Sequence, residues 1–205
     1  KMYLIGDIGN TETKIFLLNE KLKLKKKWTI STISLTNTYL DSKIKLTSIE
    51  ILKIKKILFS SVVPNTFQLI KKFLIKKNKK LKIYELKQID LKKIIKLKVN
   101  RKQVGSDRIA NAIGVTNSNK NYIVIDFGTA TTFDVIIDKT YLGGVIAPGV
   151  KLSLENLSNK ASLIPKIKLS KISNVIGTNT SEAVKSGFFW GYLGLIDNII
   201  KLIKK

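Results

Sequence analysis

Two aspartates in this chain follow short apolar runs and precede a glycine by two residues. Asp7 follows the apolar residues 2–5 in Gly6-Asp7-Ile8-Gly9, and Asp126 follows residues 122–125 in Asp126-Phe127-Gly128. Glycine at a strand end lets backbone amides approach an anion, above all phosphate. Mg²⁺ that accompanies a nucleotide is held by one or two carboxylates together with phosphate oxygens. Either aspartate could instead cap a turn, but the repeated pattern predicts a site for phosphate and a cation.

A third segment, Gly105-Ser106-Asp107-Arg108, combines a carboxylate with a guanidinium. Asp107 could be the N-cap of an apolar helix, and its spacing alone favours that interpretation. Arg108 is one of two arginines in a chain that otherwise uses lysine. A planar guanidinium suits a carboxylate ligand, so Arg108 indicates a binding role for this segment.

A glycine-rich segment, residues 143–149, has the sequence Gly-Gly-Val-Ile-Ala-Pro-Gly. Its glycines could simply form turns. Together with the two Asp-x-Gly segments, however, they favour further close approach of backbone amides to an anion.

The composition excludes several classes of chemistry. The 205 residues include no His and no Cys. The chain can therefore carry no Ser-His-Asp triad, no thiol or imidazole nucleophile, no zinc site built from those groups and no disulfide. A general base must be Asp, Glu, Lys or Tyr.

The formal net charge of +24 comes from 38 basic and 14 acidic residues, and all basic residues except Arg101 and Arg108 are lysine. Specific recognition of nucleic acids favours arginine forks and interleaved aromatic residues. We therefore predict no specific nucleic-acid partner, and only the salt-sensitive binding of polyanions that charge itself produces.

The elements that must position these residues follow an α/β pattern. Apolar runs predict a β-hairpin from residues 2–5 and 14–18, and a second one from residues 122–125 and 131–137. Between and after them we expect strands at 57–60 and 82–84 and helices at 65–77, 107–115 and 183–203, with Asn179 and Glu182 in capping-box spacing before the last helix. The repeated hairpin predicts a duplicated α/β architecture of two lobes with an intervening cleft, residues 1–117 and 118–205.

The longest apolar stretch, residues 187–196, is shorter than the roughly 18 residues that a membrane-spanning helix needs. No targeting segment is visible. We therefore expect no membrane partner and a cytoplasmic location.

Taken together, five ordered segments resemble the type III pantothenate kinases, a branch of the actin, sugar-kinase and Hsp70 superfamily. The segments are Asp7 to Thr11, Gly105 to Arg108, Asp126 to Thr132, Gly143 to Gly149, and Asn179 to Ala183 with Ser186-Gly187. The resemblance implies a duplicated actin-like (ribonuclease H-like) ATPase fold. It also implies ATP-dependent phosphorylation of the primary hydroxyl of pantothenate to 4'-phosphopantothenate, the first step of coenzyme A biosynthesis.

The same resemblance implies roles for individual residues, matched by position. The first phosphate loop, which contacts ATP, corresponds to Asp7, Ile8, Gly9, Asn10, Thr11, Glu12, Thr13 and Lys14, and Thr129 matches a second ATP contact. Asp7 also lies near Mg²⁺ in this scheme, and Asp126 matches a ligand of the required monovalent cation, K⁺ or NH₄⁺. Gly105, Ser106, Asp107, Arg108 and Thr180 match the pantothenate site. Asp107 matches the base that accepts the proton of the attacking hydroxyl.

The chain departs from the family pattern just before Gly105 to Arg108. A tyrosine and then Asn-Pro usually precede it, whereas here Lys98 takes the tyrosine position, Asn100 is kept and Arg101 replaces the proline. The contact of the tyrosine is thus lost, and substrate affinity is the property that this loss would affect.

Family members are dimers, which implies a homodimer here. The predicted last helix is apolar around more than one face, through Phe188, Phe189, Trp190, Tyr192, Leu193, Leu195 and Ile196. The core of a single lobe would explain the same residues. Two alternative functions also stay open: a DNA-associated transcriptional accessory protein of the same fold, and a kinase for another small hydroxylated substrate.

Overall fold

The computed structural model describes residues 1–116 and 120–205, and it has the α/β class predicted from the sequence. The chain divides into two compact units, one of residues 1–122 and 135–143 and the other of residues 123–134 and 144–205. The boundary predicted between Asn117 and Ser118 lies outside the described residues.

The first unit contains a five-stranded mixed sheet with the strand order β3-β2-β1-β4-β5. Its strands are β1 (Met2–Ile8), β2 (Glu12–Asn19), β3 (Leu24–Ser31), β4 (Ile54–Ser61) and β5 (Ile83–Glu85). The antiparallel pairing of β1 with β2 confirms the first predicted hairpin, and β4 and β5 confirm the two predicted strands. β3 was not predicted, because consecutive lysines at 25–27 hide its alternation.

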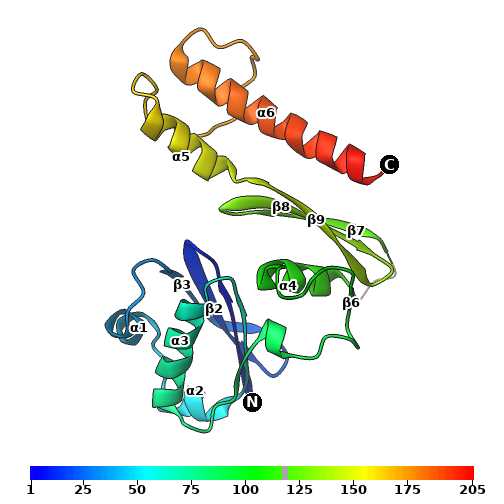
Figure 1. Ribbon diagram of the computed structural model, residues 1–205. Helices are drawn as coiled ribbons and strands as arrows, with labels where there is room; N and C mark the ends of the chain where they lie inside the picture. Colours follow the sequence, from blue (N-terminus) through cyan, green and yellow to red (C-terminus); the bar gives the residue numbers. More distant parts are fainter. Residues whose placement is uncertain (117–119) are drawn as a thin grey trace. The chain divides into compact units, whose positions relative to one another are not determined.

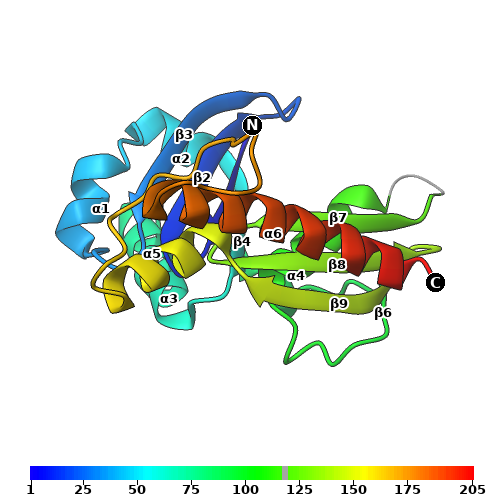
Figure 2. The same cartoon turned by 90° about the horizontal axis from the view of Figure 1, so that it is seen from above.

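Helices α1 (Asn37–Lys43) and α3 (Pro64–Lys77) cover one face of this sheet (Figures 1 and 2). The core between them is continuous and contains Leu4, Ile8, Ile15, Leu17, Leu40, Ile57, Phe59, Ile70 and Leu74, each at most 1% exposed. α3 confirms the predicted helix at 65–77. Burial of this apolar face holds the sheet in place, so residues at the ends of its strands have fixed positions.

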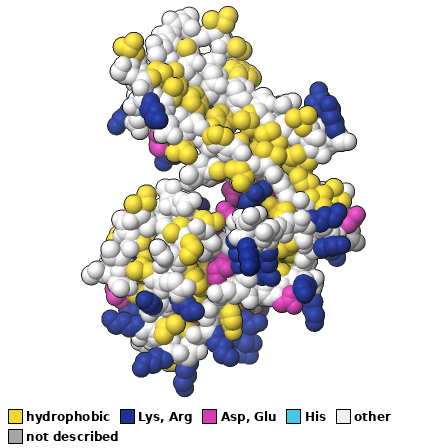
Figure 3. Space-filling view, viewed as in Figure 1, with side chains coloured by type: hydrophobic (Ala, Val, Ile, Leu, Met, Phe, Trp, Pro, Cys, Tyr) yellow, Lys and Arg dark blue, Asp and Glu magenta, His cyan; other side chains and the backbone are white. Residues whose placement is uncertain are grey.

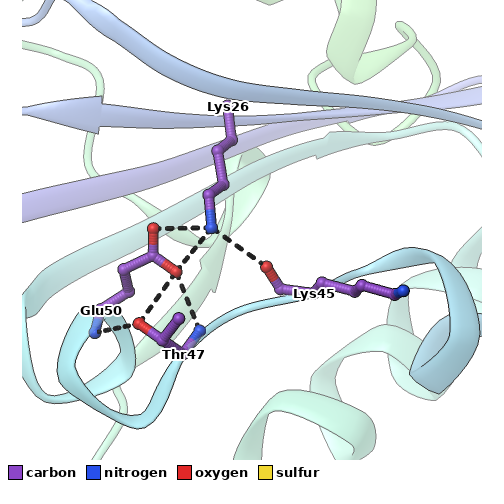
Figure 4. A network of polar contacts seen from close by, with 4 residues as sticks. All are labelled: Lys26, Lys45, Thr47 and Glu50. Atoms are coloured by element: carbon purple, nitrogen blue, oxygen red, sulfur yellow. Dashed lines mark hydrogen bonds and ion pairs between the residues drawn. The ribbon is translucent and has the colours of Figure 1, made fainter.

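A short helix, α2 (Ser48–Lys53), is tied to β3 by a network around Glu50 (Figure 4). Lys26 Nζ lies 2.8 Å from Glu50 Oε2 and donates to the Lys45 carbonyl oxygen at 3.2 Å. The Thr47 amide donates to Glu50 Oε2 at 2.8 Å, completing a capping box. The Lys26 hydrogen bond, followed by that from Thr47, lowers the pKa of Glu50 below its ordinary value of 4.5.

The first unit continues through the 3₁₀ turn η1 (Leu86–Gln88) and the two-residue strand β6 (Lys96–Leu97) to helix α4 (Ser106–Val115). α4 confirms the predicted helix at 107–115. It contacts β4 and η1 and buries Ile109 and Ala112 completely.

A second sheet has the strand order β6-β9-β8-β7, and its strands are divided between the two units. β7 (Tyr122–Phe127) and β8 (Ala130–Ile137) are neighbours, as expected for the second hairpin. β9 (Thr140–Pro148) contains all of the glycine-rich segment except Gly149, which is the N-cap of the next helix. Gly143 therefore lies inside a strand, with a φ of +121° that other residues rarely adopt.

The second unit ends in α5 (Val150–Lys160) and α6 (Thr180–Ile203), which lie side by side (Figures 1 and 2). The Tyr192 hydroxyl is 2.9 Å from Ser153 Oγ and 3.2 Å from the Pro148 carbonyl oxygen. α6 confirms the last predicted helix. Within residues 1–116 and 120–205, no helix has the length and hydropathy to cross a membrane.

Candidate functional site

Three polar side chains form a row across the first sheet, where β1 and β4 reach their carboxyl ends. Asp7 in β1 pairs with Lys14 in β2 and with Ser60 in β4. Residues paired across neighbouring strands point to the same face of a sheet, so this row brings together two predicted site residues and one that was not predicted. Asp7 and Lys14 are exposed, and Lys14 Nζ also lies 3.9 Å from Glu12 Oε2.

The turn between β1 and β2 is held by its own backbone and by the end of β3. The Gly9 amide donates to the Glu12 carbonyl oxygen at 3.0 Å, and the Thr32 amide donates to the Thr11 carbonyl oxygen at 2.9 Å. Asn10 and Thr11 stand exposed at the tip. Their backbone and side chains are therefore accessible to a ligand.

Two other residues of this predicted loop have side chains that face the core. Ile8 and Thr13 are both 0% exposed, and the Thr13 hydroxyl is 2.9 Å from that of Thr32. Gly6 is also a packing residue, because a Cβ there would lie 2.2 Å from the Phe59 ring. Only backbone atoms of these three residues could contribute to a phosphate site.

Ser60 is a candidate site residue that the sequence analysis missed. Its hydroxyl is buried and has no hydrogen-bond partner in the part of the chain that the structure describes. A buried hydroxyl without a partner costs about 1–3 kcal/mol, which a ligand could recover. The sequence signal was the position of Ser60 at the end of a strand, but its alignment with Asp7 depends on the register of β1 and β4.

The segment Gly105 to Arg108 forms the start of α4. Gly105 is the N-cap and makes no side-chain capping bond, so the alternative prediction of Asp107 as N-cap is wrong. Asp107 lies in the first turn, where its Oδ1 accepts the Arg108 amide at 2.8 Å. A Cβ at Gly105 would lie 2.3 Å from that oxygen, so any larger residue here would displace the Asp107 carboxylate. Asp107 and Arg108 are half-buried.

Val62 links the hairpin to the start of α4. The Val62 amide donates to the Ile8 carbonyl oxygen at 3.0 Å, and Val62 Cγ1 lies 3.5 Å from the Cβ position of Gly105. The first unit therefore brings the predicted phosphate loop and the predicted substrate segment to the same end of the parallel strands. Ligands of open α/β sheets commonly bind at this end.

In the second unit, Asp126 is the penultimate residue of β7 and Thr129 lies in the turn to β8, and both are exposed. The Gly149 amide donates to the Thr129 carbonyl oxygen at 3.1 Å. A Cβ at Gly149 would lie 2.3 Å from the Gly128 carbonyl oxygen, so this glycine permits close packing of two backbone segments.

Thr180 is the first residue of α6 and is exposed. The predicted capping box is half formed: Asn179 Oδ1 accepts the Glu182 amide at 3.0 Å, whereas the Glu182 carboxylate accepts from the Thr178 amide and hydroxyl. These Thr178 bonds lower the pKa of Glu182. They fix the turn just before Thr180.

A hollow of about 710 Å³ between α5 and residues 166–169 is lined by none of the predicted site residues. On the face drawn in Figure 3, basic side chains lie at several separate places, and hydrophobic ones gather over α5 and α6. In the described part of the chain, no three acidic side chains form a group that could hold a metal ion.

Comparison with known proteins decides the family. The type III pantothenate kinase family matches residues 3–202. The chain belongs to the type III pantothenate kinases. A type III pantothenate kinase of Pelagibacter ubique is 55% identical over 204 residues, covering 100% of this chain and 82% of that protein. One of Syntrophotalea carbinolica is 36% identical over 211 residues, with the same two coverages of 100% and 82%.

The predicted function is thereby confirmed: the protein is a pantothenate kinase that uses ATP and catalyses the first step of coenzyme A biosynthesis. The predicted α/β fold class is also confirmed. A Campylobacter jejuni protein described as a transcriptional activator of the Baf family has a similar structure, with a TM-score of 0.59, 22% identity, and coverage of 96% of this chain and 78% of that one. At that identity the likeness concerns the fold alone, so it lends no support to a role at DNA.

Proposed function

We propose that the first unit carries the reacting groups of this pantothenate kinase, with Asp107 as the general base. In this scheme the Asp107 carboxylate accepts the proton of the primary hydroxyl as that oxygen attacks the γ-phosphate. Phosphoryl transfer depends mainly on positioning and charge neutralisation, so one carboxylate, a phosphate loop and a cation suffice without His or Cys. The observation that carries the proposal is the linkage of the hairpin to the start of α4 through Val62.

We further propose that residues 7–14 hold the phosphates of ATP. Support comes from the exposed tip at Asn10 and Thr11 and from the cationic Lys14 beside Asp7. Ile8 and Thr13 would act through their backbone alone, because their side chains are buried. Thr129 keeps its predicted role as a second ATP contact.

Asp7 suits Mg²⁺ that arrives with the nucleotide. It is an exposed carboxylate beside the proposed phosphate loop, and Mg²⁺ prefers carboxylate and phosphate oxygens. When bound, the ion would neutralise charge on the phosphates. Asp126 is likewise an exposed carboxylate, at the end of β7, and it remains the proposed ligand of K⁺ or NH₄⁺.

The substrate side of the proposal rests on the first turn of α4. Arg108 follows Asp107 directly and offers a guanidinium for the carboxylate of pantothenate. Gly105 and Thr180 keep their predicted places in the pantothenate site, and Ser106 would contribute through its backbone, because its side chain is buried and bound to Glu85. Thr180 is exposed at the start of α6, so its hydroxyl is accessible to a substrate.

A homodimer and a cytoplasmic location remain part of the proposal. The dimer is supported by large apolar side chains of α6 that are partly open to solvent, with Trp190 39%, Leu193 40% and Leu202 57% exposed. A second copy of the chain would cover such a face.

The test is an ATP-dependent phosphorylation assay on pantothenate, pantetheine and simple sugars, each with and without K⁺. We expect turnover with pantothenate, none with sugars, and a requirement for K⁺ or NH₄⁺ that Na⁺ does not meet. A variant Asp126→Asn should weaken the activation by K⁺. Activity independent of the monovalent cation would contradict the role of Asp126, and preference for a sugar would contradict the pantothenate site.

A further inference from the structure

We propose that Glu85 is a positioning residue, which holds the first turn of α4 so that Asp107 is correctly placed as the base. The proposal rests on the proposed function of Asp107. Glu85 ends β5, pairs with Phe59 of β4, and is the N-cap of η1. Glu85 therefore belongs to the sheet, whereas Ser106, which it binds, belongs to the proposed site.

The Glu85 carboxylate joins two elements through its two oxygens. Oε1 accepts the hydroxyl of Ser106 at 2.5 Å, and Oε2 accepts the amide of Lys87 at 2.8 Å. The Glu85 amide in turn donates to Gln88 Oε1 at 3.1 Å. These bonds within η1 therefore hold Glu85 in place independently of Ser106.

Ser106 transmits this constraint to the site because it precedes Asp107 directly. Its side chain is 0% exposed, so its hydroxyl cannot turn to bulk water instead. The N-cap Gly105 supplies no side-chain bond to the helix. The bond from Ser106 to Glu85 is therefore a side-chain anchor at the very start of α4, one residue from the proposed base.

Arg101 fastens the preceding loop to the same 3₁₀ turn. Its Nη2 donates to the carbonyl oxygen of Lys87 at 2.9 Å and also to that of Ile89. The Asn100 carbonyl oxygen accepts the amides of Gln103 and Val104 at 3.0 and 3.1 Å, which folds the loop into a compact turn. Residues 100–106 are thus anchored to η1 at both ends.

The chain offers a matched control in Glu50. Like Glu85, it takes part in a capping box and binds a side chain of another element, here Lys26. Unlike Glu85, which binds Ser106, Glu50 binds Lys26 and Thr47, and neither of these is a predicted site residue. Loss of either carboxylate should lower stability, but only loss of Glu85 should change the chemistry.

The experiment compares full-length Glu85→Ala, Glu85→Gln, Ser106→Ala, the double variant Glu85→Ala with Ser106→Ala, and Glu50→Ala. Tm, kcat, and KM for ATP and pantothenate are measured for each. A hydrogen bond to a charged group contributes a free energy that corresponds to a rate change of about tenfold or more. Glu85→Ala and Ser106→Ala should therefore each lower kcat about tenfold. KM for ATP should stay within about twofold, because the phosphate loop is untouched. Glu50→Ala should lower Tm with kcat unchanged.

The double variant tests whether both residues act through one bond. We expect its kcat to match that of the single variant with the lower kcat, because removal of either partner already breaks the bond. Multiplied losses of about a hundredfold would overturn the proposal, as would a Glu85→Ala enzyme that loses Tm and keeps kcat. If Glu85→Ala does not fold, Ser106→Ala decides by the same criteria, while Glu85→Gln keeps an acceptor oxygen for the Ser106 hydroxyl and should retain most of kcat.

Failure of the underlying function has a separate signature. An Asp107→Asn enzyme with full turnover would refute the proposed base, whatever the Glu85 variants do. Loss of turnover in Asp107→Asn together with full kcat in Ser106→Ala and Glu85→Ala would refute the positioning role alone.

Discussion

The substitution Asp107→Asn separates two roles that this carboxylate could have. Its Oδ1 accepts the Arg108 amide at 2.8 Å in the first turn of α4. Asparagine has nearly the same shape and keeps an oxygen for this bond. The variant should therefore retain the helix and lose only the charge.

The two roles differ in expected magnitude. A negative charge in the first turn of a helix stabilises it by about 0.3–1 kcal/mol, through the helix dipole. A general base contributes about 10²–10⁴ in rate, which corresponds to about 3–5 kcal/mol of activation free energy. If Asp107 is the base, the loss appears in kcat. If it only supports the helix, the loss appears in Tm and is small.

The assay follows ADP release with saturating ATP and pantothenate, and binding of both ligands is measured by calorimetry. We expect kcat to fall at least about a hundredfold while both ligands bind within about threefold of the normal affinity. Asp41→Asn is a suitable control, because Asp41 pairs with Lys77 on the surface of the first unit. A kcat of Asp107→Asn equal to that of this control would refute the base assignment.

Four other perturbations have definite expected outcomes. Glu50→Gln should lower the unfolding free energy by about 1–2 kcal/mol near neutral pH, with the bond to Lys26 as the main loss. Because that bond lowers the pKa of Glu50 from 4.5, its stabilisation is present above pH 4.5 and is lost as pH falls through the lowered pKa. The unfolding free energies of the wild-type and Glu50→Gln proteins should therefore converge in acid. A difference that stays constant with pH would contradict this. Gly6→Ala should cost about 1–3 kcal/mol or more in unfolding experiments, because its Cβ would lie 2.2 Å from Phe59; an unchanged Tm would show that the ring can move aside. Ser60→Ala should raise Tm, because it removes an unpartnered buried hydroxyl, and should raise KM for ATP or pantothenate about threefold; unchanged KM values would exclude Ser60 from the site. Leu193→Asp should convert a dimer into a 23.0 kDa species in sedimentation, whereas a wild-type protein already of that mass would contradict the dimer.

Local patterns in the sequence were sufficient for much of the fold. Apolar runs beside glycine predicted the hairpin of β1 and β2, and helical periodicity predicted α3, α4 and α6 with ends correct to within a few residues. These features depend on neighbours within a few positions, so they can be read without a three-dimensional context. β3 and α5 were missed, because lysine runs mask the alternation of the first and the apolar face of the second is short.

The family, and with it the reaction, also followed from the sequence, since it depends on which residues occur in which order. The burial of Ile8 and Thr13, the alignment of Ser60 with Asp7, and the anchoring of Ser106 by Glu85 did not follow. Each of these depends on the register of strands or on contacts between residues about twenty or more positions apart. Packing of the whole first unit decides such contacts, because a shift of one residue in a strand would turn its side chains to the opposite face.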